Sequence, residues 1–128
     1  MTALVADPTC KEHHTGSHHP EQPARFDAAV SALEGLDLLP LPPRAASVDE
    51  IALCHGRDYI RLAEREIMAG LHELSTGDTI ISPRSWDAAL HATGSILNAV
   101  DAVMDRRAQN AFCIVRPPGH HATSDRGM

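Results

Sequence analysis

A run of five apolar residues restricts the possible folds of this chain most strongly, and it reads Ala111-Phe112-Cys113-Ile114-Val115. The run has no polar alternation, which is typical of a central strand in a parallel sheet that is buried on both faces. Successive parallel strands need long crossover connections, usually helices. The run therefore predicts an α/β domain in which helices flank a mainly parallel sheet.

The first part of the chain supplies another strand and two of the helices. Apolar residues 3–5 predict a short strand that ends at a turn. Apolar residues recur at helical spacing over residues 23–36, which predicts a helix with Pro23 in its first turn. Ser47 and Glu50 match a capping box, so a short helix is expected to begin there.

Two further helices are predicted before the apolar run. One covers residues 59–70, with Asp58 as its cap and a buried stripe formed by Ile60, Ala63 and Ile67. The longest helix begins at Ser82, as cap, with Pro83 in its first turn. Its apolar stripe is expected to be buried and consists of Trp86, Ala89, Leu90, Thr93, Ile96, Leu97, Val100, Val103 and Met104.

Charge and composition exclude several classes of function. The 128 residues fit one domain, and their net charge of −6 argues against direct binding of nucleic acid or an anionic membrane through charge. No segment approaches the roughly 18 apolar residues of a membrane span, and the first residues have no basic start or long apolar run, so no signal peptide is expected. The expected location is the cytoplasm.

Two adjacent histidines, His120 and His121, follow the apolar run after Arg116-Pro117-Pro118-Gly119. Open α/β sheets place their sites beyond the carboxyl ends of strands, where this pair is expected to lie. Imidazoles titrate near neutral pH, so the pair suits proton transfer in the hydrolysis of an acyl bond if a zinc ion activates the substrate. A surface turn that contains two histidines by chance is the alternative interpretation.

A second group of histidines occurs near the N-terminus and consists of His13, His14, His18 and His19. Their density indicates either a metal site or a polar surface loop. Because no carboxylate or thiol completes a known ligand spacing, the surface loop is the preferred interpretation.

Several motifs in order along the chain resemble the zinc-dependent histone deacetylase family. The resemblance is to its class II and bacterial deacetylase-like branch, which includes acetylpolyamine amidohydrolases and acetoin-utilisation proteins. The residues that carry it are Val115-Arg116-Pro117-Pro118-Gly119-His120-His121-Ala122, His19-Pro20-Glu21 with Pro23 and Arg25, His55-Gly56-Arg57-Asp58-Tyr59-Ile60, and Gly77-Asp78-Thr79 with Ser82-Pro83.

The resemblance implies an arginase-like α/β fold and zinc-dependent removal of acetyl groups from lysine or from small amines. By the same resemblance, His121 is the general base and then the general acid, and His120 hydrogen-bonds the attacking water. Arg25 matches an arginine near the family's acetate-release channel. Asp78 and Gly119 match positions that contact the substrate.

The zinc ligands of the family follow the double histidine, and no residue here matches them. The resemblance therefore implies that residues 1–128 are the N-terminal portion of a truncated domain, which lacks the family's zinc site and is inactive alone. Such a portion would expose a sheet edge through which it could self-associate. The alternatives are a non-catalytic module that binds an acetylated ligand or a partner, and a metal-binding protein that uses its N-terminal histidines.

Overall fold

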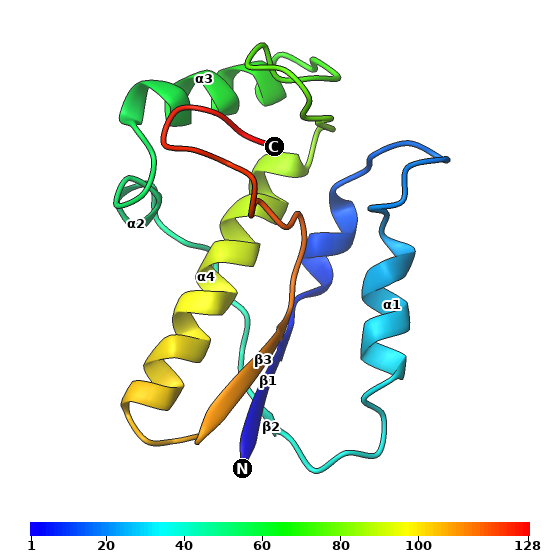
Figure 1. The fold of residues 1–128 in the computed structure, drawn as a ribbon, viewed down its shortest axis with the longest axis vertical. Coiled ribbons are helices and arrows are strands. Elements are labelled where there is room, and N and C mark those ends of the chain that lie inside the picture. The colour runs from blue at the N-terminus through cyan, green and yellow to red at the C-terminus, as the bar shows by residue number, and fades with distance from the viewer.

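Three parallel strands form the centre of the structure, a computed structural model that describes residues 1–128 (Figure 1). They are β1 (Thr2–Ala6), β2 (Leu39–Pro40) and β3 (Asn110–Ile114), in the order β2-β1-β3. The register pairs Leu4 with Phe112 and Ala3 with Leu39. The strands predicted at residues 3–5 and 111–115 and their place in a parallel sheet are therefore confirmed, whereas β2 lies in a stretch for which no strand was predicted.

Helices cover the two faces of the sheet, and the sequence of β1 explains how. Ala3 and Val5 are fully buried in a cluster with small residues of α4 (Ser85–Met104), whereas Leu4 and Ala6 pack toward Phe26 of α1 (Ala24–Ser31). Alternate residues of a strand point to opposite faces, so an entirely apolar strand needs a layer on each side. Figure 1 shows α1 and α4 on opposite sides of the sheet. The helix predicted to Leu36 ends at Ser31, and Gly35 adopts a positive φ in the turn that follows.

Three shorter elements complete the fold. A 3-10 helix, η1 (Pro8–Glu12), follows β1 directly, and α2 (Val48–Ile51) begins at the predicted capping box of Ser47 and Glu50. The helix α3 (Arg57–Met68) buries the predicted stripe, which consists of Ile60, Ala63 and Ile67. Its predicted cap is wrong: Asp58 lies within the first turn and pairs with Arg61, and Gly56 occupies the cap position without a side-chain bond.

The helix α4 differs from its prediction in both its start and its buried face. It begins at Ser85, and the Ser82 hydroxyl does not cap the helix but accepts a hydrogen bond from the backbone of His14 at 3.0 Å. Its buried face consists mainly of small residues, which are Ser85, Ala88, Ala92, Gly94, Ser95, Ala99 and Ala102. Of the predicted stripe, Val100 and Met104 are 51% and 75% exposed. Because this helix packs closely against the rest of the chain, its buried face holds small side chains, and larger apolar side chains such as Val100 and Met104 lie on its exposed face.

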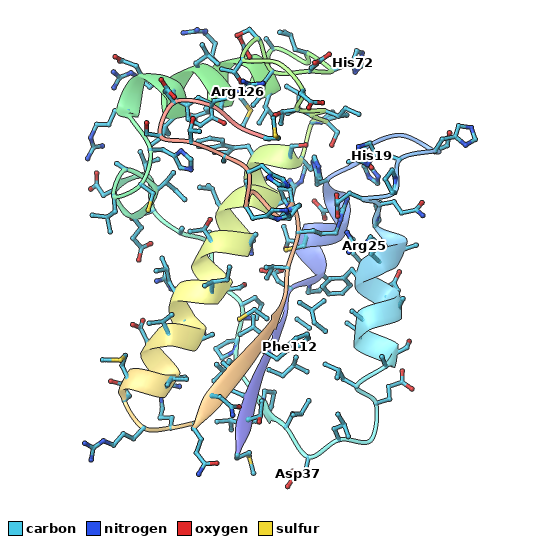
Figure 2. The ribbon with its side chains drawn as sticks, viewed as in Figure 1. His19, Arg25, Asp37, His72, Phe112 and Arg126 are labelled. Atoms are coloured by element: carbon cyan, nitrogen blue, oxygen red, sulfur yellow. The ribbon has the colours of Figure 1, made fainter.

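The strand β3 is not buried on both faces as predicted. Phe112 is 52% exposed, and Figure 2 shows it on the sheet. The reason is that β3 is an edge strand that pairs only with β1, and its packing with α1 is concentrated at its carboxyl end, where Ile114 contacts Phe26. None of the helices is both long enough and apolar enough to cross a membrane.

Candidate active site

The strands β1 and β3 are parallel neighbours, so their carboxyl ends lie side by side at one edge of the sheet. Beyond their carboxyl ends lies a cavity of about 710 Å³. Residues that follow β1, residues that follow β3, and residues of α3, α4 and the loop between them all line it. The fold thus forms a cavity where open α/β sheets hold their ligands.

The histidine pair lies at this cavity. The rings of His120 and His121 are 4.1 Å apart between centroids and are tilted by 53°. Gly119 has a φ of +68°, a conformation that favours glycine, and its carbonyl accepts a hydrogen bond from the Ala122 amide at 3.0 Å. Both rings are exposed, and His121 and Gly119 line the cavity.

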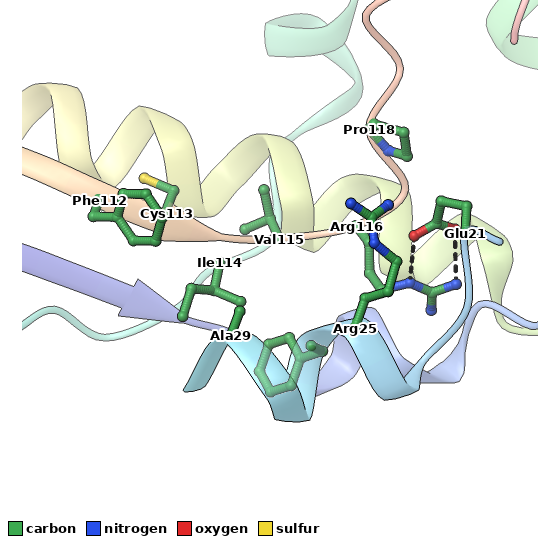
Figure 3. Close-up of a pocket in the computed structure, with 10 residues that line it drawn as sticks. Glu21, Arg25, Ala29, Phe112, Cys113, Ile114, Val115, Arg116 and Pro118 are labelled. Carbon is green, nitrogen blue, oxygen red and sulfur yellow. Dashed lines mark hydrogen bonds and ion pairs between the residues drawn. The ribbon is translucent and has the colours of Figure 1, made fainter. Parts of the chain in front are cut away.

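Arg116, at the start of the segment that carries the pair, is deeply buried and donates four hydrogen bonds. Its Nε and Nη2 atoms donate to the two carboxylate oxygens of Glu21, each at 2.9 Å (Figure 3). Its Nη1 atom donates to the carbonyl oxygens of Cys10 at 2.7 Å and His13 at 2.6 Å. The arginine before the histidine pair is therefore joined to the segment that follows β1.

His13 is buried, so its assignment to a polar surface loop is wrong. Its Nδ1 atom lies 2.7 Å from the Ser85 hydroxyl, which also accepts a hydrogen bond from the Ser82 amide. Burial, together with the positive charge of Arg116, lowers the pKa of His13 to about 4. This ring is therefore neutral near pH 7 and serves as a fixed polar part of the cavity wall.

Asp78 lines the same cavity from the loop between α3 and α4. The loop is held by backbone amides that donate to carboxylates: Asp78 to Glu73 at 3.0 Å and Ser75 to Glu66 at 2.9 Å. Hydrogen bonding from the side chain and backbone of Ser75 lowers the pKa of the Glu66 carboxyl below its usual range.

The C-terminal segment packs against the same loop and against α3. The amide of Gly56 donates to the Ser124 carbonyl at 2.8 Å. Gly127 lies so close to Tyr59 that a Cβ atom added there would be 2.6 Å from the phenolic oxygen. The segment that carries the histidines is thus attached at both of its ends.

Arg25 lines a second, smaller cavity of about 230 Å³ with Glu21, Arg116 and Pro118 (Figure 3). The structure therefore brings His121, Gly119 and Asp78 to one cavity and places Arg25 at another, with the ion pair of Arg116 and Glu21 contributing to the lining of the smaller one.

Sequence reasoning did not single out Asp7 or the pairing of Glu21 with Arg116. The Asp7 carboxylate is almost completely buried and receives hydrogen bonds from the Thr9 amide and the Ser95 hydroxyl. It also lies 2.7 Å from His91 Nδ1, which ties the end of β1 to α4. An aspartate directly after an apolar strand is the only local signal for it, and that signal equally fits a turn.

A family model described as "Histone deacetylase domain" matches residues 19–128. The chain belongs to the histone deacetylase family. It is 32% identical to a "Probable deacetylase" of Archaeoglobus fulgidus, over 95% of this chain and 35% of the relative. It is 37% identical to "Polyamine deacetylase HDAC10" of Homo sapiens, over 94% of this chain and 19% of the relative.

A solved structure confirms the fold of this histone deacetylase family member. The crystal structure of the HDA15 HD domain superposes with a TM-score of 0.88 at 26% identity, over 99% of this chain and 39% of that chain. The α/β fold expected from the family resemblance is therefore confirmed. The chain spans about a third of the archaeal relative's length and less of the human one.

Proposed function

We propose that these residues carry the proton-transferring histidines of a zinc-dependent amide hydrolase, which removes acetyl groups from lysine side chains or acetylated small amines. The observation that supports this most directly is the position of His121, which lines the large cavity beyond the sheet and has the ring of His120 beside it. Membership of the histone deacetylase family and likeness to a polyamine deacetylase support the substrate class.

In this proposal His121 accepts a proton from the attacking water and later gives it to the leaving amine. His120, whose ring centroid is 4.1 Å away, holds the same water through a hydrogen bond. The Asp78 carboxylate attracts the substrate's amine or accepts its backbone N–H, and Gly119 allows close approach because it has no side chain. Arg25 pairs with the acetate product in the smaller cavity.

Zinc is the cofactor that the family resemblance implies. Within residues 1–128, no group of three or more His, Cys, Asp or Glu side chains could hold a metal ion. These residues alone therefore do not fit a zinc ion, which in proteins is usually bound by at least three side chains. Zinc binding in the proposed hydrolase would need ligands outside them.

The first test is an assay of the 128-residue chain on an acetyl-lysine peptide and on N-acetylputrescine, with and without added zinc. No turnover is expected, because no metal-holding group is present. Turnover that is lost in His121→Gln would show that these residues are catalytically complete and would overturn the requirement for other ligands.

The second test is a chimera in which this chain replaces the matching segment of the Archaeoglobus fulgidus relative. The His121→Gln substitution is expected to lower kcat/KM for the acetylated substrate by about 10²- to 10⁴-fold, the usual contribution of a general acid–base group. His72→Gln is the matched control, because His72 is exposed in a loop and does not line the large cavity. Equal activity of the two variants would refute the role of His121.

A non-catalytic assembly module is the second candidate, and the exposed edge of β3 favours it. The strand pairs on one side only, and Phe112 is 52% exposed on it. An unpaired edge strand can pair with a second copy of the chain. Sedimentation velocity is expected to show a dimer that Phe112→Lys dissociates; a monomer at all accessible concentrations would exclude self-association.

A further inference from the structure

The side chain of Arg116 is only 4% exposed, and it makes four hydrogen bonds to three different residues. Two of these bonds go to the Glu21 carboxylate and two go to the backbone carbonyls of Cys10 and His13. All three partners lie about a hundred residues earlier in the chain. A single guanidinium therefore holds the segment after β3 against the segment after β1.

These hydrogen bonds fix the orientation of the Arg116 guanidinium more than they stabilise the fold. Desolvation offsets much of the attraction in a buried ion pair, so such a pair is weak evidence for a stabilising role. A two-pronged contact between a planar guanidinium and a carboxylate, however, permits only one relative orientation. The two carbonyl bonds fix the remaining edge of the guanidinium, so Arg116 has little freedom to move.

A stiff stretch of backbone connects Arg116 to the two histidines, so the position of Arg116 determines theirs. Pro117 and Pro118 follow it, and each proline ring fixes its backbone φ angle. Gly119 then begins a tight turn that the Ala122 amide closes, and this turn contains both His120 and His121. A displacement at Arg116 therefore moves the two rings together.

Glu21, the partner of Arg116, is itself tied to the cavity wall. Its backbone amide donates to the His19 Nδ1 atom at 3.0 Å, and His19, Glu21 and His121 all line the large cavity. The ion pair thus joins two segments that line the cavity, the one that follows β1 and the one that follows β3.

We propose that Arg116 is a positioning residue, which acts with Glu21 to place the histidine pair at the cavity. The proposal rests on the proposed function of His121 for its catalytic meaning. Its geometric content is independent of turnover, so it can be tested on the 128-residue chain without an activity assay.

The test uses NMR on Arg116→Lys and Glu21→Gln. Lysine keeps the charge but cannot make the two-pronged bond, and glutamine keeps the shape but removes the charge. Exchange of the Ala122 amide with solvent is expected to become about tenfold faster in Arg116→Lys, since loss of one hydrogen bond to a charged group has an effect of this size. The magnetisation transfer between the His120 and His121 rings should decrease in parallel, with a smaller change in Glu21→Gln.

Two control variants separate positioning from general stability. Val5→Ala lowers global stability by removing fully buried methyl groups from β1, and Arg61→Gln breaks an exposed ion pair on α3. Ala122 exchange and the ring contact should match wild type in both controls under native conditions. An unchanged Ala122 amide and ring contact in Arg116→Lys, or equal losses in Val5→Ala, would overturn the proposal, whereas an inactive chimera would bear only on the proposed function.

Discussion

Replacement of Gly94 by alanine tests the packing of α4 most directly. A Cβ atom at this position would lie 2.5 Å from backbone atoms of both Ala45 and Ala46, and it would also meet the carbonyl of Arg44. Non-bonded carbon atoms normally stay about 3.5–4 Å apart, so the overlap is about 1 Å. The atoms in the way belong to backbone and cannot rotate aside as a side chain would.

The neighbouring segment is also held in place, which sets the size of the effect. The Ala46 amide donates to the Leu90 carbonyl at 2.9 Å, and the Asn98 side chain donates to the Pro42 carbonyl at 2.6 Å. Moving this segment away would break these bonds, each worth about 1 kcal/mol, in addition to an overpacking cost of about 1–3 kcal/mol. Alanine regains about 1 kcal/mol of helix propensity, so the net loss of stability is about 2–4 kcal/mol.

Urea unfolding followed by circular dichroism would measure this loss as a lower midpoint with an unchanged slope. Gly56→Ala is the matched control, because its Cβ atom would lie 3.8 Å from the nearest atom, and it should cost only about 0.5 kcal/mol at a helix cap. A neutral or stabilised Gly94→Ala variant would refute the close contact between α4 and residues 44–46.

Two further predictions concern pH and the C-terminal segment. Because burial and Arg116 lower the pKa of His13 to about 4 in the folded chain, from 6.5, the unfolded chain binds more protons between these values. Stability should therefore fall as pH decreases through this window, by up to about 1.4 kcal/mol per pH unit, and urea midpoints should show a weaker pH dependence in His13→Gln. In Gly127→Ala the new Cβ atom would lie 2.6 Å from the Tyr59 hydroxyl and displace the segment. Exchange of the Gly56 amide should then accelerate by about tenfold without a change in global unfolding, and an unaltered rate would show that Gly127 does not anchor the segment.

Local patterns predicted those elements whose determinants lie within a few residues. The capping box of Ser47 and Glu50 and the buried stripe of α3 belong to this class. The buried face of α4 was predicted incorrectly because the large apolar residues of this helix are not its most buried ones. Closeness to the sheet and to residues 44–46 requires the small side chains of Ala99 and Gly94, and larger residues such as Val100 are left outside.

The candidate site shows the same division. The histidine pair and its strand-end position were predictable from a motif and from the general location of sites in α/β sheets. The ion pair of Arg116 with Glu21 was not, because its members lie 95 residues apart and no local spacing relates them. The burial of His13 likewise depends on α4 packing over it, through the contact with Ser85.

Because β1 is central in the sheet, the sheet cannot form until its partner β3 has been synthesised. β1 is made first, but its long partner is β3, with Thr2 aligned to Asn110. At about 5–20 residues per second, roughly 5–20 seconds of synthesis separate the two strands. Over that interval β1, apolar on both faces, has only the two-residue strand β2 as a partner in the sheet. Exposure of this apolar strand before β3 is synthesised should therefore lower the yield of folded protein in the cell.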